Sequence, residues 1–152
     1  MNLAQLLVRA ARLFPDRPAL FHGEDLICDY RQLGERAARI AGYLARDCGL
    51  EPGERVALFM GNVPEYLELF YGIWYAGLVA VPINAKLHPR EAQYIIEDAG
   101  AAVVFATPDL ACALQPLTAQ MPAVRQLLCV GNADYEQVYG GRPLAARDRL
   151  AD

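Results

Sequence analysis

The sequence contains no serine, and its 152 residues include only two threonines, one lysine and two histidines. A serine nucleophile and a Ser/Thr-Gly phosphate loop both need hydroxyl side chains at defined places, so neither can be built from this chain. A Walker-type loop with its lysine is excluded by the same inspection. Any catalytic role of this chain alone would therefore rest on very few residues.

Other kinds of signal are also missing. No apolar run approaches the roughly 18 residues that a membrane-spanning helix needs. Residues 1–14 carry two arginines inside an apolar pattern and no small-residue cleavage site, which favours an amphipathic helix over a signal peptide. The formal net charge of −4 provides no electrostatic case for binding nucleic acid or an anionic membrane.

The four cysteines show neither a C-x-x-C pair nor a spacing typical of metal ligands; they are Cys28, Cys48, Cys112 and Cys129. We predict that all four are buried, reduced thiols of a cytoplasmic protein. A chain of this length buries about 70% of its unfolded surface, so it needs neither disulfides nor metal to fold as a single domain.

Helix-start and helix-end signals recur along the chain. The capping-box pairs are Asn2 with Gln5, Asp29 with Gln32 and Asn62 with Glu65; Pro89 and Pro108 suit first helical positions, and Gly49 and Gly100 suit left-handed ends. With the apolar periodicity, these signals predict helices over 3–13, 30–48, 63–76, 89–99 and 108–119.

Four apolar runs predict buried strands at 55–60, 78–83, 101–105 and 126–130. Because these runs do not alternate with polar residues and each pair brackets a helix, they indicate a parallel sheet covered on both faces. Residues 18–29 predict a hairpin with Gly23-Glu24 as its turn. The predicted fold class is α/β, with a layered, largely parallel sheet, flanking helices and an N-terminal β-hairpin, followed by an irregular tail over 131–152.

The predicted helix 63–76 is apolar nearly all round. Glu65, Glu68 and Gly72 form one narrow stripe, and every other face carries bulky side chains. Such a helix is normally buried on more than one side, so we expect one of its faces to lack cover in this chain. The aromatic side chains Tyr66, Phe70 and Trp74 could wall a ligand pocket, but helical spacing of aromatics favours packing in a core.

Polar side chains follow the predicted strands, where open α/β sheets bind ligands; they are Asn62, Asn84, Thr107 and Asn132. They could line a crevice, although caps of helices and turns are the commoner role of Asn and Thr at strand ends. The turn after the first strand of the sheet has one glycine and not G-x-G-x-x-G, so the dinucleotide signal is absent. His88 fits a helix cap better than a catalytic base, and His22 fits a solvated hairpin tip.

A series of motifs runs through the chain in a fixed order, at 14–20, 29–62 and 71–105. The predicted strand at 55–60 is preceded by Gly49, Pro52 and Gly53. The motif AG at 76–77 follows later and is itself followed by VPIN at 81–84. In this combination the chain strongly resembles the opening of AMP-forming acyl-CoA synthetases, in the adenylate-forming ligase superfamily, over essentially its whole length. It departs from the family at Asp29 and at His88, where threonine is common, and both residues suit helix caps.

The resemblance implies an enzyme that couples a carboxylic acid to ATP, releases pyrophosphate and passes the acyl-adenylate to coenzyme A. In such enzymes the nucleotide loop, the metal-binding glutamate and the catalytic lysine follow a region like this one. Residues 1–152 would then be an N-terminal subdomain of the ligase domain, inactive by itself. No catalytic, cofactor-binding or metal-ligating residue is assigned within it, and ATP, Mg²⁺ and coenzyme A are implied for the parent enzyme only.

Two further assignments stay open. An adenylation domain that loads a carrier protein would share this opening, and a non-catalytic α/β binding or assembly module could derive from the same fold. As partners we expect the remainder of the parent ligase and, through exposed apolar surface, further copies of this chain. The family's large domain packs two sheets with helices between and outside them, and the second sheet would supply the missing cover of helix 63–76.

Overall fold

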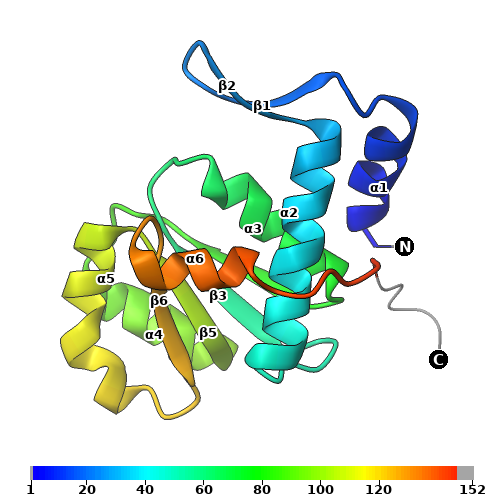
Figure 1. Cartoon of the computed structure of the whole chain (residues 1–152). Helices are drawn as coiled ribbons and strands as arrows, with labels where there is room; N and C mark the ends of the chain where they lie inside the picture. The colour runs from blue at the N-terminus through cyan, green and yellow to red at the C-terminus, as the bar shows by residue number, and fades with distance from the viewer. Residues whose placement is uncertain (1, 147–152) are drawn as a thin grey trace.

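The computed structural model describes residues 2–146 (Figure 1). Its helices are α1 (Ala4–Leu13), α2 (Tyr30–Gly42), α3 (Glu65–Tyr75), α4 (Pro89–Ala99), α5 (Pro108–Leu114) and α6 (Ala133–Tyr139), with a π-helical turn over Tyr43–Asp47 and a 3₁₀ segment over Gln115–Gln120. The strands are β1 (Pro18–His22), β2 (Asp25–Asp29), β3 (Arg55–Phe59), β4 (Val79–Ile83), β5 (Ala101–Ala106) and β6 (Gln126–Cys129).

The main sheet has the strand order β4-β3-β5-β6 and is parallel throughout. Val56 in the central strand pairs with Ala80 on one side and with Val103 on the other. The connection through α3 moves the chain to one side of β3, and the connection through α4 brings it back to the other side. Right-handed crossovers therefore place α3 and α4 on opposite faces of the sheet, which confirms the predicted three-layer α/β architecture.

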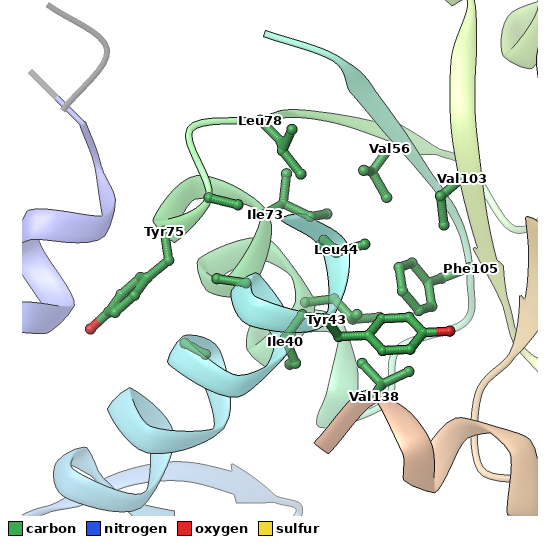
Figure 2. Close-up of a cluster of buried hydrophobic side chains, with 14 of the residues drawn as sticks. Ile40, Tyr43, Leu44, Val56, Ile73, Tyr75, Leu78, Val103, Phe105 and Val138 are labelled. Atoms are coloured by element: carbon green, nitrogen blue, oxygen red, sulfur yellow. The ribbon is translucent and has the colours of Figure 1, made fainter. Parts of the chain in front are cut away.

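The two faces of the sheet enclose separate apolar cores because successive strand residues point in opposite directions. One core joins the sheet to α2, α3 and α6, and the other joins it to α4 and α5. Figure 2 shows the first core, in which Ile40, Leu44 and Ile73 point toward Val56 and Phe105 of the sheet. This core also connects the N-terminal helices to the sheet.

The hairpin of β1 and β2 forms a separate two-stranded antiparallel sheet. Its turn begins at Gly23, whose φ of 62° confirms the need for glycine first in the turn. In Figure 1 the hairpin stands at the edge of the molecule, beyond the start of α2.

Three helix starts follow the sequence signals, including that of α5 at Pro108, and two do not. The Asp29 side chain accepts from the Gln32 N–H at 2.8 Å and completes the predicted capping box, and His88 with Glu91 forms another. The capping boxes predicted at Asn2 and Asn62 are wrong. Asn62 has no capping role because α3 starts after Pro64, while the Asn2 amide reaches the carbonyl of Trp74 at 2.5 Å. The Oδ1 of Asn2 also accepts from the Ala4 N–H at 2.9 Å, so this side chain bonds both to the start of α1 and to α3.

The predicted irregular tail over 131–152 needs correction, because α6 lies within it. Asn132 caps this helix by accepting from the Tyr135 N–H at 2.9 Å. Tyr135 and Val138 are buried in the core, but two apolar positions in a helix of two turns give too short a pattern for periodicity to detect. Residues 140–146 form no regular element, and 147–152 lie outside the described residues.

The prediction that all four cysteines are buried is wrong for Cys112 and Cys129. Cys112 is exposed on α5, whose opposite side packs on the sheet, and Cys129 is half-buried. Cys28 and Cys48 are buried as predicted, and none of the four cysteines forms a disulfide within residues 2–146. An amphipathic helix hides only one face, so burial of an apolar residue cannot be inferred from its presence in a helix.

Within residues 2–146, no helix has the length and apolar character that crossing a bilayer requires. The same residues contain no group of three or more His, Cys, Asp or Glu side chains placed to hold a metal ion.

Candidate functional site

The carboxyl ends of β3 and β5 meet where the order of connections reverses, which is the place where open α/β sheets bind ligands. Here the Gly61 N–H donates to the Thr107 Oγ1 across a distance of 3.3 Å. The Thr107 hydroxyl thus accepts a hydrogen bond that joins the two loops. Thr107 also precedes α5, although its side chain makes no capping bond to that helix.

The other predicted polar residues along this edge act within the chain. Asn84 accepts from the Lys86 N–H at 2.9 Å, and Asn132 caps α6 as described above. His88 Nδ1 accepts from the Arg90 N–H at 3.2 Å, which confirms its role as a helix cap. These hydrogen bonds support the capping interpretation and do not gather the side chains into one polar crevice.

A hollow of about 350 Å³ lies between the hairpin and the start of α3. Its lining residues are Leu20, Phe21, His22, Asn62, Val63, Pro64, Tyr66 and Leu67. His22 and Asn62 are the polar side chains there, and both are exposed. The hollow is therefore an apolar surface with a polar edge rather than a constellation suited to acid–base or phosphate chemistry.

Two members of the narrow stripe of α3 are deeply buried against α2. Gly72 lies so close to α2 that a Cβ placed on it would be 2.4 Å from Ile40 Cγ2, and Glu68 is only 1% exposed. Leu69 and Ile73 are fully buried beside them, and other bulky side chains lie on the far side of the helix. Leu67 is 47% exposed. With the half-buried side chains of Phe70, Tyr71 and Trp74 it forms what we call the outer face of α3.

The aromatic residues of α3 pack on the core and on one another, which supports the core interpretation over a pocket wall. The ring centroids of Tyr66 and Phe70 are 5.2 Å apart, and those of Phe70 and Trp74 are 5.1 Å apart. Such contacts are typical of aromatic clusters. The expectation that one face of this helix lacks cover is consistent with the exposure of Leu67.

A buried ionic contact that the sequence analysis missed connects α2, α3 and α6. Arg36 Nη1 lies 2.5 Å from Glu68 Oε1, and the Tyr139 hydroxyl donates to Glu68 Oε2. Burial, and then the hydrogen bond to Glu68, raise the pKa of Tyr139. Burial alone would lower the pKa of Arg36, but the hydrogen bond and the charge of Glu68 raise it above its ordinary value. The available signal in the sequence was a carboxylate, Glu68, among bulky apolar residues in the middle of the helix.

The π-helical turn forms a second polar cluster, at the edge of β6. The Tyr43 hydroxyl donates to Gln126 Oε1 at 3.2 Å, and the Cys48 thiol lies 3.5 Å from the same oxygen. Burial raises the pKa of Tyr43 to about 12 and that of Cys48 to about 11. Because only the thiolate is nucleophilic, Cys48 is suited to a structural role and not to catalysis.

These raised pKa values predict that stability falls at alkaline pH. The unfolded Cys48 thiol loses its proton near 9.0, whereas the folded thiol holds it to about 11, so the folded state binds more protons in that window. Between pH 8 and pH 10 the Cys48 contribution to the free energy of unfolding should fall by about 1 kcal/mol. Urea unfolding at both pH values would show this loss as the difference between wild type and Cys48→Ala, because tyrosine contributions remain in both proteins. Equal losses in the two proteins would contradict the burial of Cys48.

Comparison with known proteins assigns this fold. Residues 7–149 match the family described as AMP-binding enzyme. The chain belongs to this family. Among curated relatives, it is 36% identical over 115 residues to a long-chain-fatty-acid–CoA ligase of Salmonella typhimurium, covering 75% of this chain and 20% of the relative. It is 39% identical over 112 residues to a feruloyl-CoA synthase of Amycolatopsis sp., covering 74% of this chain and 22% of the relative.

The fold likeness extends over nearly the whole chain of this AMP-binding family member. The N-terminal domain of FACL13 from Mycobacterium tuberculosis superposes with a TM-score of 0.88 at 28% identity, covering 98% of this chain and 38% of that one. The chain thus corresponds to an N-terminal portion of AMP-forming acyl-CoA synthetases, which confirms the resemblance. It spans about a fifth of the length of the curated relatives it matches.

Proposed function

We propose that this chain is the N-terminal part of an ATP-dependent acyl-CoA ligase, which converts a carboxylic acid, ATP and coenzyme A into acyl-CoA, AMP and pyrophosphate. The observation that carries the proposal is the family match over residues 7–149. Both kinds of relative described above are named for coenzyme A ligation or acyl-CoA synthesis, one with long-chain fatty acids and the other with a feruloyl group.

In this proposal the chain provides a scaffold and not the reacting groups. At the carboxyl edge of the sheet, the side chains of Thr107 and Asn84 accept hydrogen bonds from the N–H groups of Gly61 and Lys86. Glu68, the buried carboxylate, is held by Arg36 and Tyr139. Binding of ATP, Mg²⁺ and coenzyme A would then belong to the remainder of the ligase. A cytoplasmic location would agree with four cysteines that form no disulfide within the described residues.

The remainder of the ligase is also the partner that we propose for the outer face of α3. Beside this face, Leu3 and Trp74 line a hollow of about 230 Å³ next to the edge strand β4. Leu3 and Leu67 are each 47% exposed, and contiguous apolar surface of this kind usually marks an interaction site. The chain by itself should satisfy this surface through self-association, as the sequence analysis expected.

Activity assays test the proposed function. A protein that continues this chain into the full ligase should release pyrophosphate and form acyl-CoA when given ATP, Mg²⁺, coenzyme A and either a long-chain fatty acid or ferulic acid. The 152-residue chain should do neither and should show no calorimetric heat of ATP binding at micromolar affinity. Micromolar ATP binding by the isolated chain would contradict the scaffold role.

The same assays separate the alternatives. Pyrophosphate exchange without acyl-CoA would favour an adenylation domain that loads a carrier protein. Absence of both activities in the extended protein, with every acid tested, would favour a non-catalytic module.

A further inference from the structure

Residues 133–146 lie across α2 and α3 as one continuous segment, which we call the 133–146 segment. It begins with α6, whose Tyr135 and Val138 enter the core, and continues as an extended stretch along α2 (Figure 1). Leu144 and Ala146 pack against the same core. Through α6 the segment packs on β6 and, by way of Tyr135, on Phe105 of β5. The further contacts described below join it to α2, its π-helical turn and α3.

The first attachment is a close crossing of two backbones at glycines. A Cβ placed on Gly42 would lie 1.8 Å from the carbonyl oxygen of Arg142, and one placed on Gly141 would lie 2.2 Å from the carbonyl oxygen of Arg39. No side chain larger than hydrogen fits either position without movement of the backbone. The crossing lies where α2 passes into its π-helical turn.

The second attachment consists of hydrogen bonds that connect the segment to the α2 region. The Leu144 N–H donates to the carbonyl of Ala38 at 2.9 Å, and Arg46 Nη1 donates to the carbonyl of Arg142 at 2.6 Å. A backbone N–H outside the helix thus supplies a hydrogen bond to a carbonyl of α2. This bond exists only while the segment is in place.

The third attachment is Glu68, which lies between two partners that are 32 and 71 residues away in the sequence. Its Oε1 pairs with Arg36 of α2 and its Oε2 accepts the Tyr139 hydroxyl of α6. Removing one partner of a buried charge leaves part of the cost of desolvating that charge uncompensated. Glu68 therefore favours the closed position of α6 over any position in which Tyr139 is withdrawn.

From these contacts we propose that the 133–146 segment opens and closes as one unit, and that the contact between Glu68 and Tyr139 holds it closed. The segment follows the last strand of the sheet, so it can detach while all four strands stay paired. Because the glycine crossing and the Leu144 bond lie beyond Tyr139 in the chain, loss of the Tyr139 contact should loosen them as well. Local opening of this kind is a recognised property of cooperative units within a fold. This inference concerns the chain itself and does not depend on the proposed function.

Tyr139→Phe tests the proposal, and Tyr94→Phe is its matched control. Tyr94 is 67% exposed on α4, on the other face of the sheet, so removal of its hydroxyl leaves the contacts of the segment untouched. In Tyr139→Phe, hydrogen exchange of the Leu144 amide should accelerate about tenfold or more, since the lost bond is to a charged group. The Leu144 amide donates to the carbonyl of Ala38, and the substitution does not change this acceptor. Amides of β5 should exchange at wild-type rates, and Tyr94→Phe should leave the Leu144 rate within about twofold of wild type.

The reverse experiment starts at the other end of the segment. Gly141→Ala forces the crossing apart, whereas Gly140→Ala brings its new Cβ only to 3.2 Å from the nearest atom. Gly141→Ala should accelerate exchange of the Val138 and Tyr139 amides along with that of Leu144, and Gly140→Ala should do so far less. Acceleration of Leu144 alone would overturn the proposal of a single unit. Equal acceleration of the β5 amides would overturn it too, because the variant would then have weakened the whole fold. An unchanged Leu144 exchange rate in Tyr139→Phe would also overturn the proposal.

Discussion

The free energy of unfolding of Gly72→Ala is expected to be about 2 kcal/mol lower than that of the wild type. The destabilisation from overpacking at a tight helix crossing exceeds the stabilisation from the higher helix propensity of alanine. A Cβ at this position would meet Ile40 Cγ2 at 2.4 Å and Ile40 Cβ at 2.6 Å. Ile40 is fully buried and cannot rotate into solvent. Urea unfolding followed by far-ultraviolet circular dichroism measures the difference.

Gly34→Ala is the matched control for this prediction, since Gly34 is also a helical glycine without a positive φ. A Cβ there would come no closer than 3.3 Å to another atom, the Cβ of Ala11. The higher helix propensity of alanine should then leave stability unchanged or raise it by up to about 1 kcal/mol. If Gly72→Ala were as stable as Gly34→Ala, α2 and α3 would not pack as closely as the structure has them.

The second large effect concerns self-association of the 152-residue chain. Sedimentation should show the wild type as a dimer or larger species at about 100 µM. Leu67→Lys should weaken this association at least about tenfold, because burying a lysine side chain on the outer face of α3 in an interface has a high desolvation cost. Leu67 is 47% exposed, so the substitution should spare the fold. Circular dichroism of the variant checks that its helix content is retained.

Tyr94→Lys provides the control, because Tyr94 is 67% exposed on α4, on the opposite side of the sheet. The same charge placed there should leave the association constant unchanged. A wild-type chain that sediments as a monomer at this concentration would refute the expectation that the outer face of α3 is buried by self-association.

Much of the fold was predictable because its signals are local. The strands are apolar runs that fall within a residue or two of their observed bounds, and the helix starts at Asp29 and His88 depend on side chains three residues apart or less. The end of the helix predicted over 108–119 was less accurate. Pro116 lacks the N–H that an α-helix needs, so the chain continues as a 3₁₀ segment.

What the sequence did not predict depends on contacts between distant segments. Periodicity identified the stripe of Glu68 and Gly72 but could not tell which side of α3 meets α2. The partners of Glu68 lie 32 and 71 residues away, at Arg36 and Tyr139, beyond the range of any spacing rule. The bond from Gly61 to Thr107 likewise joins two loops that only the sheet brings together.

The central position of β3 has a consequence for the order in which the protein can be synthesised and folded. Both of its neighbours come later in the chain, since Val56 pairs with Ala80 and with Val103. While β5 is still inside the ribosome, the apolar strand β3 of the nascent chain therefore has one edge unpaired. Long-range parallel pairing is slow, and open strand edges favour aggregation. We expect the ribosome-bound intermediate that ends between β4 and β5 to be the species most dependent on chaperones.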